Sequence, residues 1–187
     1  DKHLSDIRIQ RLVKVLADYS IEVKLGQWVR IDGDVETLPM LRELYAYLTE
    51  RGAHVTTQIN DAYMTREFYR HASDDQLMWQ SPTSRLQIEK LDARIVLLGQ
   101  PNTRAMTNID ATRMQKHRAS MMELFQISSK RSADGDYKWA LTQFPTEAAA
   151  QEANMSLEEY EDFIYSACYC DREDPVAEWR RVHDEQA

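Results

Sequence analysis

Apolar residues in the first 144 positions repeat with two different periods, which predict helices that alternate with strands. Between residues 6 and 19 the apolar positions recur every three or four residues, as on one face of an amphipathic helix. A second helical stripe runs from residue 38 to residue 48, and Gly52 follows where a helix C-terminus is expected. The same reasoning predicts two short helices after residue 59 (the second capped by Ser73), helices at 82–91 and 108–127, and an exposed loop at 128–136.

Four short segments have the composition of strands. They are QWVRID at 27–32, HVTTQI at 54–59, ARIVLL at 93–98 and KWALTQF at 138–144. The apolar run at 93–98 is predicted to be buried on both faces, as strands of parallel sheets are. Strands that alternate with helices need crossover connections. The chain is therefore predicted to be an α/β protein with a mostly parallel sheet and helices on both faces, doubly wound in the Rossmann or flavodoxin manner.

The last quarter of the chain has a different pattern. It contains no strand signal, and helices are predicted at 147–153, from Ser156 onward and at 175–183. Ser156 and Glu159 have the spacing of a capping box at the start of the second of these helices. We therefore divide the chain into an α/β domain, 1–144, and a helical extension, 145–187, that packs on this domain or leads out of it.

The net charge of −8 comes entirely from this extension. Residues 1–144 carry 20 basic and 19 acidic side chains, a net charge of +1, whereas residues 145–187 carry 3 basic and 12 acidic ones, a net charge of −9. An acidic surface repels phosphate groups, so nucleic acid is not expected as a partner. The acidic segment is otherwise interpreted as a solvated helical face.

Composition places the chain among ordinary globular proteins of a reducing compartment. Hydrophobic residues make up 43% and charged residues 29% of the sequence. No apolar run approaches the ~20 residues of a membrane span, so no membrane partner is expected. The beginning of the sequence lacks both the apolar core of a signal peptide and an initiator methionine, and we expect a fragment or a processed product. Two cysteines are too few for a secreted disulfide framework, which favours the cytoplasm.

No residue cluster in the sequence has the spacing of a catalytic or metal site. The histidines are scattered and form no H-E-x-x-H motif; they are His3, His54, His71, His117 and His183. Cys168 and Cys170 lack the C-x₂-C spacing of zinc ribbons and are interpreted as one buried thiol and one incidental one. There is no G-x-S-x-G elbow, and the loop GDVE at 33–36 has one glycine and two acids, which would repel a pyrophosphate. We therefore predict no catalytic and no metal-binding residue in this chain.

One loop follows a strand at the position where open α/β sheets usually bind ligands. The sequence GQPNTR at 99–104 comes directly after the strand at 93–98. Asn102, Thr103 and Arg104 offer amide, hydroxyl and guanidinium donors for a ligand or for a neighbouring domain. The alternative is a proline-initiated turn whose polar groups cap the local backbone. The sequence leaves both interpretations open.

Several stretches resemble one known family. The first is PNTRA at 101–105, and the second comprises WALTQFPT at 139–146, AAAQEA at 148–153 and MSLEEYEDF at 155–163. Together with VLADYSIEVKLGQWVRIDG at 15–33 and the segment 86–98, they resemble the thermophilic-type metalloaminopeptidases, the aminopeptidase T and S family. The resemblance extends over nearly the whole chain in the expected order.

This resemblance implies a cytoplasmic exopeptidase that removes N-terminal residues from peptide substrates, commonly as a homodimer. It also implies two divalent metal ions of the zinc or cobalt type, held by Glu, His and Asp side chains in the second half of a much longer chain. Because this sequence stops at Ala187, before any such motif, no catalytic residue can be carried over and the catalytic domain is expected to be absent. The chain would then be an N-terminal, non-catalytic domain; the alternative is a stand-alone α/β module for small-ligand binding or dimerisation.

Overall fold

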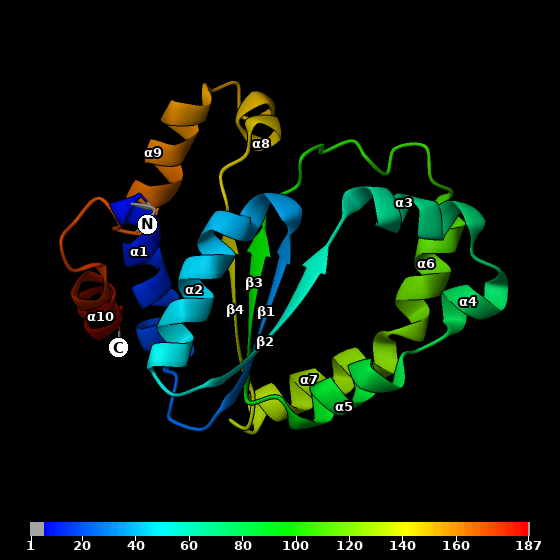
Figure 1. Ribbon diagram of the computed structural model, residues 1–187, viewed down its shortest axis with the longest axis horizontal. Coiled ribbons are helices and arrows are strands. Elements are labelled where there is room, and N and C mark those ends of the chain that lie inside the picture. The colour runs from blue at the N-terminus through cyan, green and yellow to red at the C-terminus, as the bar shows by residue number, and fades with distance from the viewer. Residues whose placement is uncertain (1–5, 187) are drawn as a thin grey trace.

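The computed structural model describes residues 6–186, and its sheet contains four parallel strands in the order β2-β1-β3-β4 (Figure 1). The strands are β1 (Trp28–Asp34), β2 (His54–Asn60), β3 (Ala93–Leu98) and β4 (Lys138–Gln143). Ile31 of β1 lies between Thr57 of β2 and Ile95 of β3, and Ile95 lies beside Ala140 of β4. The predicted α/β class with a parallel sheet is confirmed.

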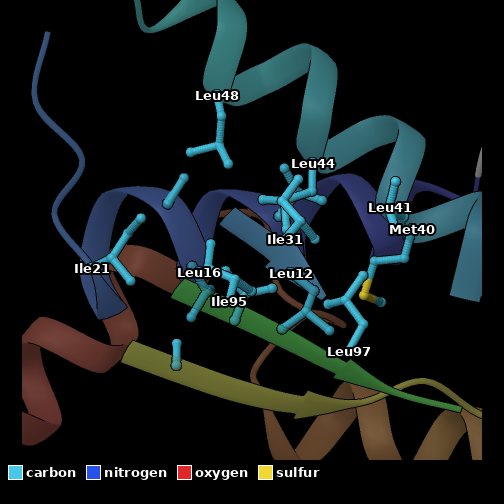
Figure 2. Close-up of a cluster of buried hydrophobic side chains, with 14 of the residues drawn as sticks. Leu12, Leu16, Ile21, Ile31, Met40, Leu41, Leu44, Leu48, Ile95 and Leu97 are labelled. Atoms are coloured by element: carbon cyan, nitrogen blue, oxygen red, sulfur yellow. The ribbon is translucent and has the colours of Figure 1, made fainter. Parts of the chain in front are cut away.

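One face of the sheet is covered by helices, and the main hydrophobic core lies between them and the strands (Figure 2). The covering segments are α1 (Ile7–Lys14), its π-helical continuation η1 (Val15–Ser20), the short turn η2 (Val35–Thr37) and α2 (Leu38–Glu50). The helical stripes predicted from the sequence point into this core, where each fully buried Leu or Ile contributes about 1.5–3 kcal/mol. The largest buried side chains include Leu12, Leu44, Leu48, Ile31, Ile95 and Leu97.

A second group of helices lies on the other side of the sheet (Figure 1). They are α3 (Ala62–His71), α4 (Asp74–Met78), α5 (Pro82–Lys90), α6 (Ala111–Ser120) and α7 (Met122–Ala133). The predicted cap at Ser73 is confirmed, since its hydroxyl accepts a hydrogen bond from the backbone N–H of Gln76 (3.2 Å). No helix within residues 6–186 is long and apolar enough to cross a membrane.

The loop predicted at 128–136 is largely wrong. Helix α7 continues to Ala133, so only the last three residues of that stretch connect it to β4. The polar side chains responsible for the prediction lie on a helix, and the Arg131 guanidinium donates to the backbone oxygen of Ile88 on α5 (2.7 Å). Polar composition alone does not separate an exposed helix from a loop.

The second face of the sheet carries a buried ion cluster on its two central strands. Arg30 and Asp32 of β1 are 6% and 2% exposed, and the Arg30 Nε donates to Asp32 Oδ1 (2.6 Å). Arg94 of β3 donates through its Nε to the other Asp32 oxygen, Oδ2 (2.7 Å). The prediction that β3 is buried on both faces is wrong, because Arg94, Val96 and Leu98 are only half-buried. The helices on this side cover the strands only in part.

The chain after β4 forms helices α8 (Glu147–Glu152), α9 (Leu157–Ala167) and α10 (Pro175–Gln186), of which α9 and α10 lie against α1 (Figure 1). Tyr165 of α9 is 2% exposed and belongs to the same core as α1 and α2. The Arg8 guanidinium lies 4.8 Å from the centre of the Tyr165 ring and pairs with Glu161 of α9 (3.2 Å). The Trp179 ring of α10 stacks on Tyr19. The division of the chain into two domains at residue 144 stays a prediction.

Candidate functional site

The loop that follows β3 lies at the switch point of the sheet. From β1 the chain continues to β2 on one side, and from β3 it continues to β4 on the other side. In open α/β sheets this reversal creates a crevice beyond the carboxyl ends of the two strands. The two strand ends meet here directly, since the backbone N–H of Gly99 donates to Asp34 Oδ2 (3.0 Å).

Protein atoms fill most of this crevice. Thr37 is fully buried between the two strand ends, and its hydroxyl donates to the backbone oxygen of Asp34 (2.7 Å). A Cβ at Gly33 would lie 2.3 Å from the Thr37 Oγ1, and a Cβ at Gly99 would lie 2.5 Å from the Thr37 Cγ2. Both glycines therefore allow the backbone to close on Thr37. The hollow that remains at the switch point measures about 90 Å³, too small for a dinucleotide.

Asn102, Thr103 and Arg104 are exposed, and each makes a local contact. The Asn102 Oδ1 accepts a hydrogen bond from the backbone N–H of Arg104 (2.9 Å), which closes a turn. The Thr103 hydroxyl donates to Glu152 Oε1 of α8 (2.8 Å), and the Arg104 Nε lies 3.5 Å from the same oxygen. Thr103 and Arg104 thus connect the loop to α8, and Asn102 stabilises the turn of the loop itself. Whether they also contact a ligand or a further domain stays a prediction.

Two hollows lie on either side of the contact between Thr103 and Glu152. One measures about 520 Å³ and is lined by Leu98, Gln100, Gln143, Thr146 and Tyr160 among others. The other measures about 630 Å³ and is bounded by residues 101–104 and by α8 and its end. Glu152 is the one carboxylate among the residues that line these two hollows. The sequence did not single it out, because a contact between residues 49 positions apart leaves no local pattern.

The hollows offer hydrogen bonds but no catalytic pair. Hydrolysis requires a nucleophile, or a metal-bound water, beside a base that activates it. The lining supplies one carboxylate that is already bonded to Thr103, together with hydroxyl and amide groups. Such groups can orient a polar ligand or contact another protein surface.

His71 and His117 make separate contacts in the described part of the chain. Within residues 6–186 no three His, Cys, Asp or Glu side chains come together to hold a metal ion. The His71 Nε2 lies 3.2 Å from Glu67 Oε2, and the His117 Nδ1 lies 2.9 Å from the backbone oxygen of Leu77. His3 lies outside the described residues.

Cys168 and Cys170 are protonated thiols in this environment. Burial raises the pKa of the Cys168 thiol. Burial also raises the pKa of Cys170 to about 12, with smaller contributions from Cys168 and Asp171. Only the thiolate acts as a nucleophile or a metal ligand, so neither cysteine is prepared for such a role at neutral pH.

Comparison with known proteins identifies relatives over almost the whole chain. Residues 5–187 match the family described as thermophilic metalloprotease (M29). The chain is 24% identical over 190 residues to Aminopeptidase 2 of Geobacillus stearothermophilus, a match that covers 96% of this chain and 46% of the relative. Its fold is similar to the solved structure of wild-type AmpT from Thermus thermophilus, with a TM-score of 0.71 at 16% identity, over 93% of this chain and 45% of that one. The chain thus spans less than half the length of either protein.

Proposed function

The chain belongs to the M29 family of thermophilic metalloproteases, and we propose that it is the N-terminal, non-catalytic portion of a metal-dependent aminopeptidase. Such an enzyme removes N-terminal residues from peptides. In this proposal the α/β domain forms a wall of the substrate cavity, a docking face for the catalytic part, or a dimer contact. The Asn102–Arg104 loop and Glu152 belong to that wall or contact.

One observation carries the proposal. Within residues 6–186 no three metal-ligand side chains converge, although the family is one of metalloproteases. A two-metal hydrolase needs several carboxylate and imidazole ligands around its ions. The matched region covers only 46% of Aminopeptidase 2, which leaves more than half of that relative to supply such ligands.

In this proposal the metal ions bind to the part of the enzyme outside these 187 residues. We propose two divalent ions of the zinc or cobalt type in the whole enzyme, peptides as substrates, a homodimer and a cytoplasmic location. The residues described here do not fit such ions, so no catalytic step is derived from them.

We expect the purified 187-residue chain to leave aminoacyl-anilide substrates uncleaved, with or without added cobalt or zinc, because residues 6–186 bring no three metal-ligand side chains together. Fusing it to the part of Aminopeptidase 2 that it does not match should give metal-dependent hydrolysis. The measurement is the rate of anilide release, and chelator-treated fusion protein is the control. Hydrolysis by the 187-residue chain alone, at a rate proportional to its bound metal, would contradict the proposal.

A stand-alone ligand-binding or dimerisation module is the second candidate. The two hollows beside Thr103 and Glu152 favour it. A ligand that binds only the folded chain raises its melting temperature in a saturable way. This candidate gains support if such a ligand is found and if Arg104→Ala weakens its effect, whereas concentration-dependent sedimentation without any ligand effect would indicate dimerisation.

A further inference from the structure

We propose that one bare part of the sheet is the surface on which the rest of the aminopeptidase fold docks; the proposal rests on the function proposed above. This surface, named the open face, consists of Val96, Phe125, Trp139 and Leu141, with the buried Tyr137 at its base. These residues belong to β3, to α7, to the segment before β4 and to β4 itself. The occupant is the part of the relatives' chain that has no counterpart in these 187 residues, and it presents an apolar surface with acidic side chains at its edge.

Large apolar side chains are exposed on the open face. Trp139 is 60% exposed, Leu141 53% and Phe125 66%. Together with Val96 and Tyr137 they line a hollow of about 380 Å³, whose remaining walls come from Arg94 and two serines of α7. Contiguous exposed apolar side chains mark interaction surfaces in soluble proteins. A tryptophan beside a hollow is a typical anchor of such a surface.

The two edge strands of the sheet, β2 and β4, differ in the polarity of the side chains on the face with the ion cluster. This difference indicates which edge a partner covers. On the face that carries the ion cluster, β2 presents Thr56 and Gln58, in register with Arg30 and Asp32. Both β2 side chains are exposed and polar, so they are well hydrated without a partner. The other edge strand, β4, presents Trp139 and Leu141 to the same side. Exposure of these two apolar side chains to water is unfavourable, so a partner is expected over β4 and not over β2.

The helix layer on this side ends before it reaches β4. Over β1, the Arg30 guanidinium meets Gln87 of α5, which closes that part of the face. Over β4, Trp139 and Leu141 stay open while the opposite side of the strand is buried, with Ala140 and Thr142 at 9% and 8% exposure. Parallel sheets occur almost only with both faces covered. The strand is therefore built to be covered on its second side as well.

The length of the relatives indicates what provides this cover. The matched region makes up 46% of Aminopeptidase 2 and 45% of the AmpT chain. Each relative thus holds more residues outside the matched region than inside it. A polypeptide of that size is sufficient to cover the open face and to extend along the neighbouring helices.

Charge argues against a second copy of this chain as the occupant. A two-fold interface brings the same patch of each copy into contact with itself. Helix α7, which lines the open face, carries two basic side chains, Lys130 and Arg131, and one acidic one, Glu123. A second copy would bring two such helices, and two Arg94 side chains, near each other. A partner with acidic groups at the edge of an apolar surface avoids this repulsion.

Thiol labelling of Leu141→Cys tests the assignment, because Cys170 is buried, Cys168 is half-buried and the raised pKa of both thiols keeps the background low. The maleimide reaction rate is measured in the 187-residue chain and in its fusion to the unmatched part of Aminopeptidase 2. A covered thiol reacts only after local opening, so we expect the rate to fall about tenfold or more in the fusion. Phe163→Cys, at a position 55% exposed on α9, is the matched control and should react at the same rate in both.

The two proposals fail in different ways. Equal rates for Leu141→Cys in the chain and the fusion, or protection of Phe163→Cys alone, would overturn the docking assignment, even in a fusion that hydrolyses peptides. Protection of Leu141→Cys in a fusion without metal-dependent hydrolysis would support the docking site and contradict the proposed function. Protection in the 187-residue chain alone that grows with its concentration would assign the open face to a second copy.

A second variant requires no fusion protein. Trp139→Glu in the 187-residue chain should leave the melting temperature nearly unchanged and improve solubility, because most of this side chain is exposed. A loss of stability similar to that of a core substitution would show that the face is already occupied and would overturn the proposal.

Discussion

Asp32→Ala is expected to lower the free energy of unfolding by about 3–5 kcal/mol, since it removes one partner of a buried ion cluster. The Arg30 side chain is only 7% exposed and would retain Gln87 as its remaining acceptor. Arg94, whose side chain is 34% exposed, can turn towards water and loses less. Because small domains are stable by only about 5–15 kcal/mol, the variant should lose much of its stability. Urea denaturation followed by circular dichroism measures the change.

Asp134→Ala is the matched control for this substitution. Asp134 pairs with Lys130 on the surface, where the two side chains are 48% and 77% exposed. Exposed pairs of this kind contribute about 0–1 kcal/mol. The combined substitution Arg30→Met and Asp32→Leu should recover most of the lost stability, because it removes both charges. If Asp32→Ala costs no more than Asp134→Ala, the Arg30 guanidinium is hydrated and the cluster is not buried.

Tyr165→Ala should destabilise the chain by about 3 kcal/mol or more, the usual cost of removing a large buried ring. Tyr165 joins the helical extension to the core, and the Arg8 guanidinium lies over its ring. Burial raises the pKa of Tyr165, so its hydroxyl stays protonated at neutral pH. We expect faster hydrogen exchange in α9 and α10 in addition to the lower unfolding free energy, because these helices lose their anchor on α1.

Phe163→Ala on the same helix provides the comparison, since Phe163 is 55% exposed. It should change the unfolding free energy by about 0.5 kcal/mol or less, as surface substitutions do. Equal effects of the two substitutions would mean that the extension leads away from the domain. The α/β domain (1–144) and the helical extension (145–187) would then be independent parts of the chain.

The fold could be predicted from the sequence where one period dominates. The α2 segment and the strand at 93–98 have strong local patterns, and both form as expected. The prediction that this strand is buried on both faces is wrong because its apolar run contains Arg94, whose side chain joins the ion cluster on the second face. Arg30 and Asp32 were the available signal: residues two apart on a strand share one face, so two opposite charges there indicate a buried pair.

The candidate site was predictable only in its location. The position of the loop after β3 follows from the order of strands and helices, and the structure places Asn102 and Thr103 there. Glu152 comes from α8, 49 residues away, and no local pattern connects it to the loop. The open face depends on which helices fail to reach β4, a feature of tertiary packing that periodicity does not contain.

The central claim is that the residues of this chain do not form the metal site of the enzyme. Equilibrium dialysis of the 187-residue protein against zinc or cobalt, followed by metal analysis of the protein, tests it most directly. We predict no stoichiometric binding, because no three ligand side chains converge within residues 6–186. One or two ions held tightly per chain, and lost on replacing specific His, Asp or Glu residues, would contradict the account.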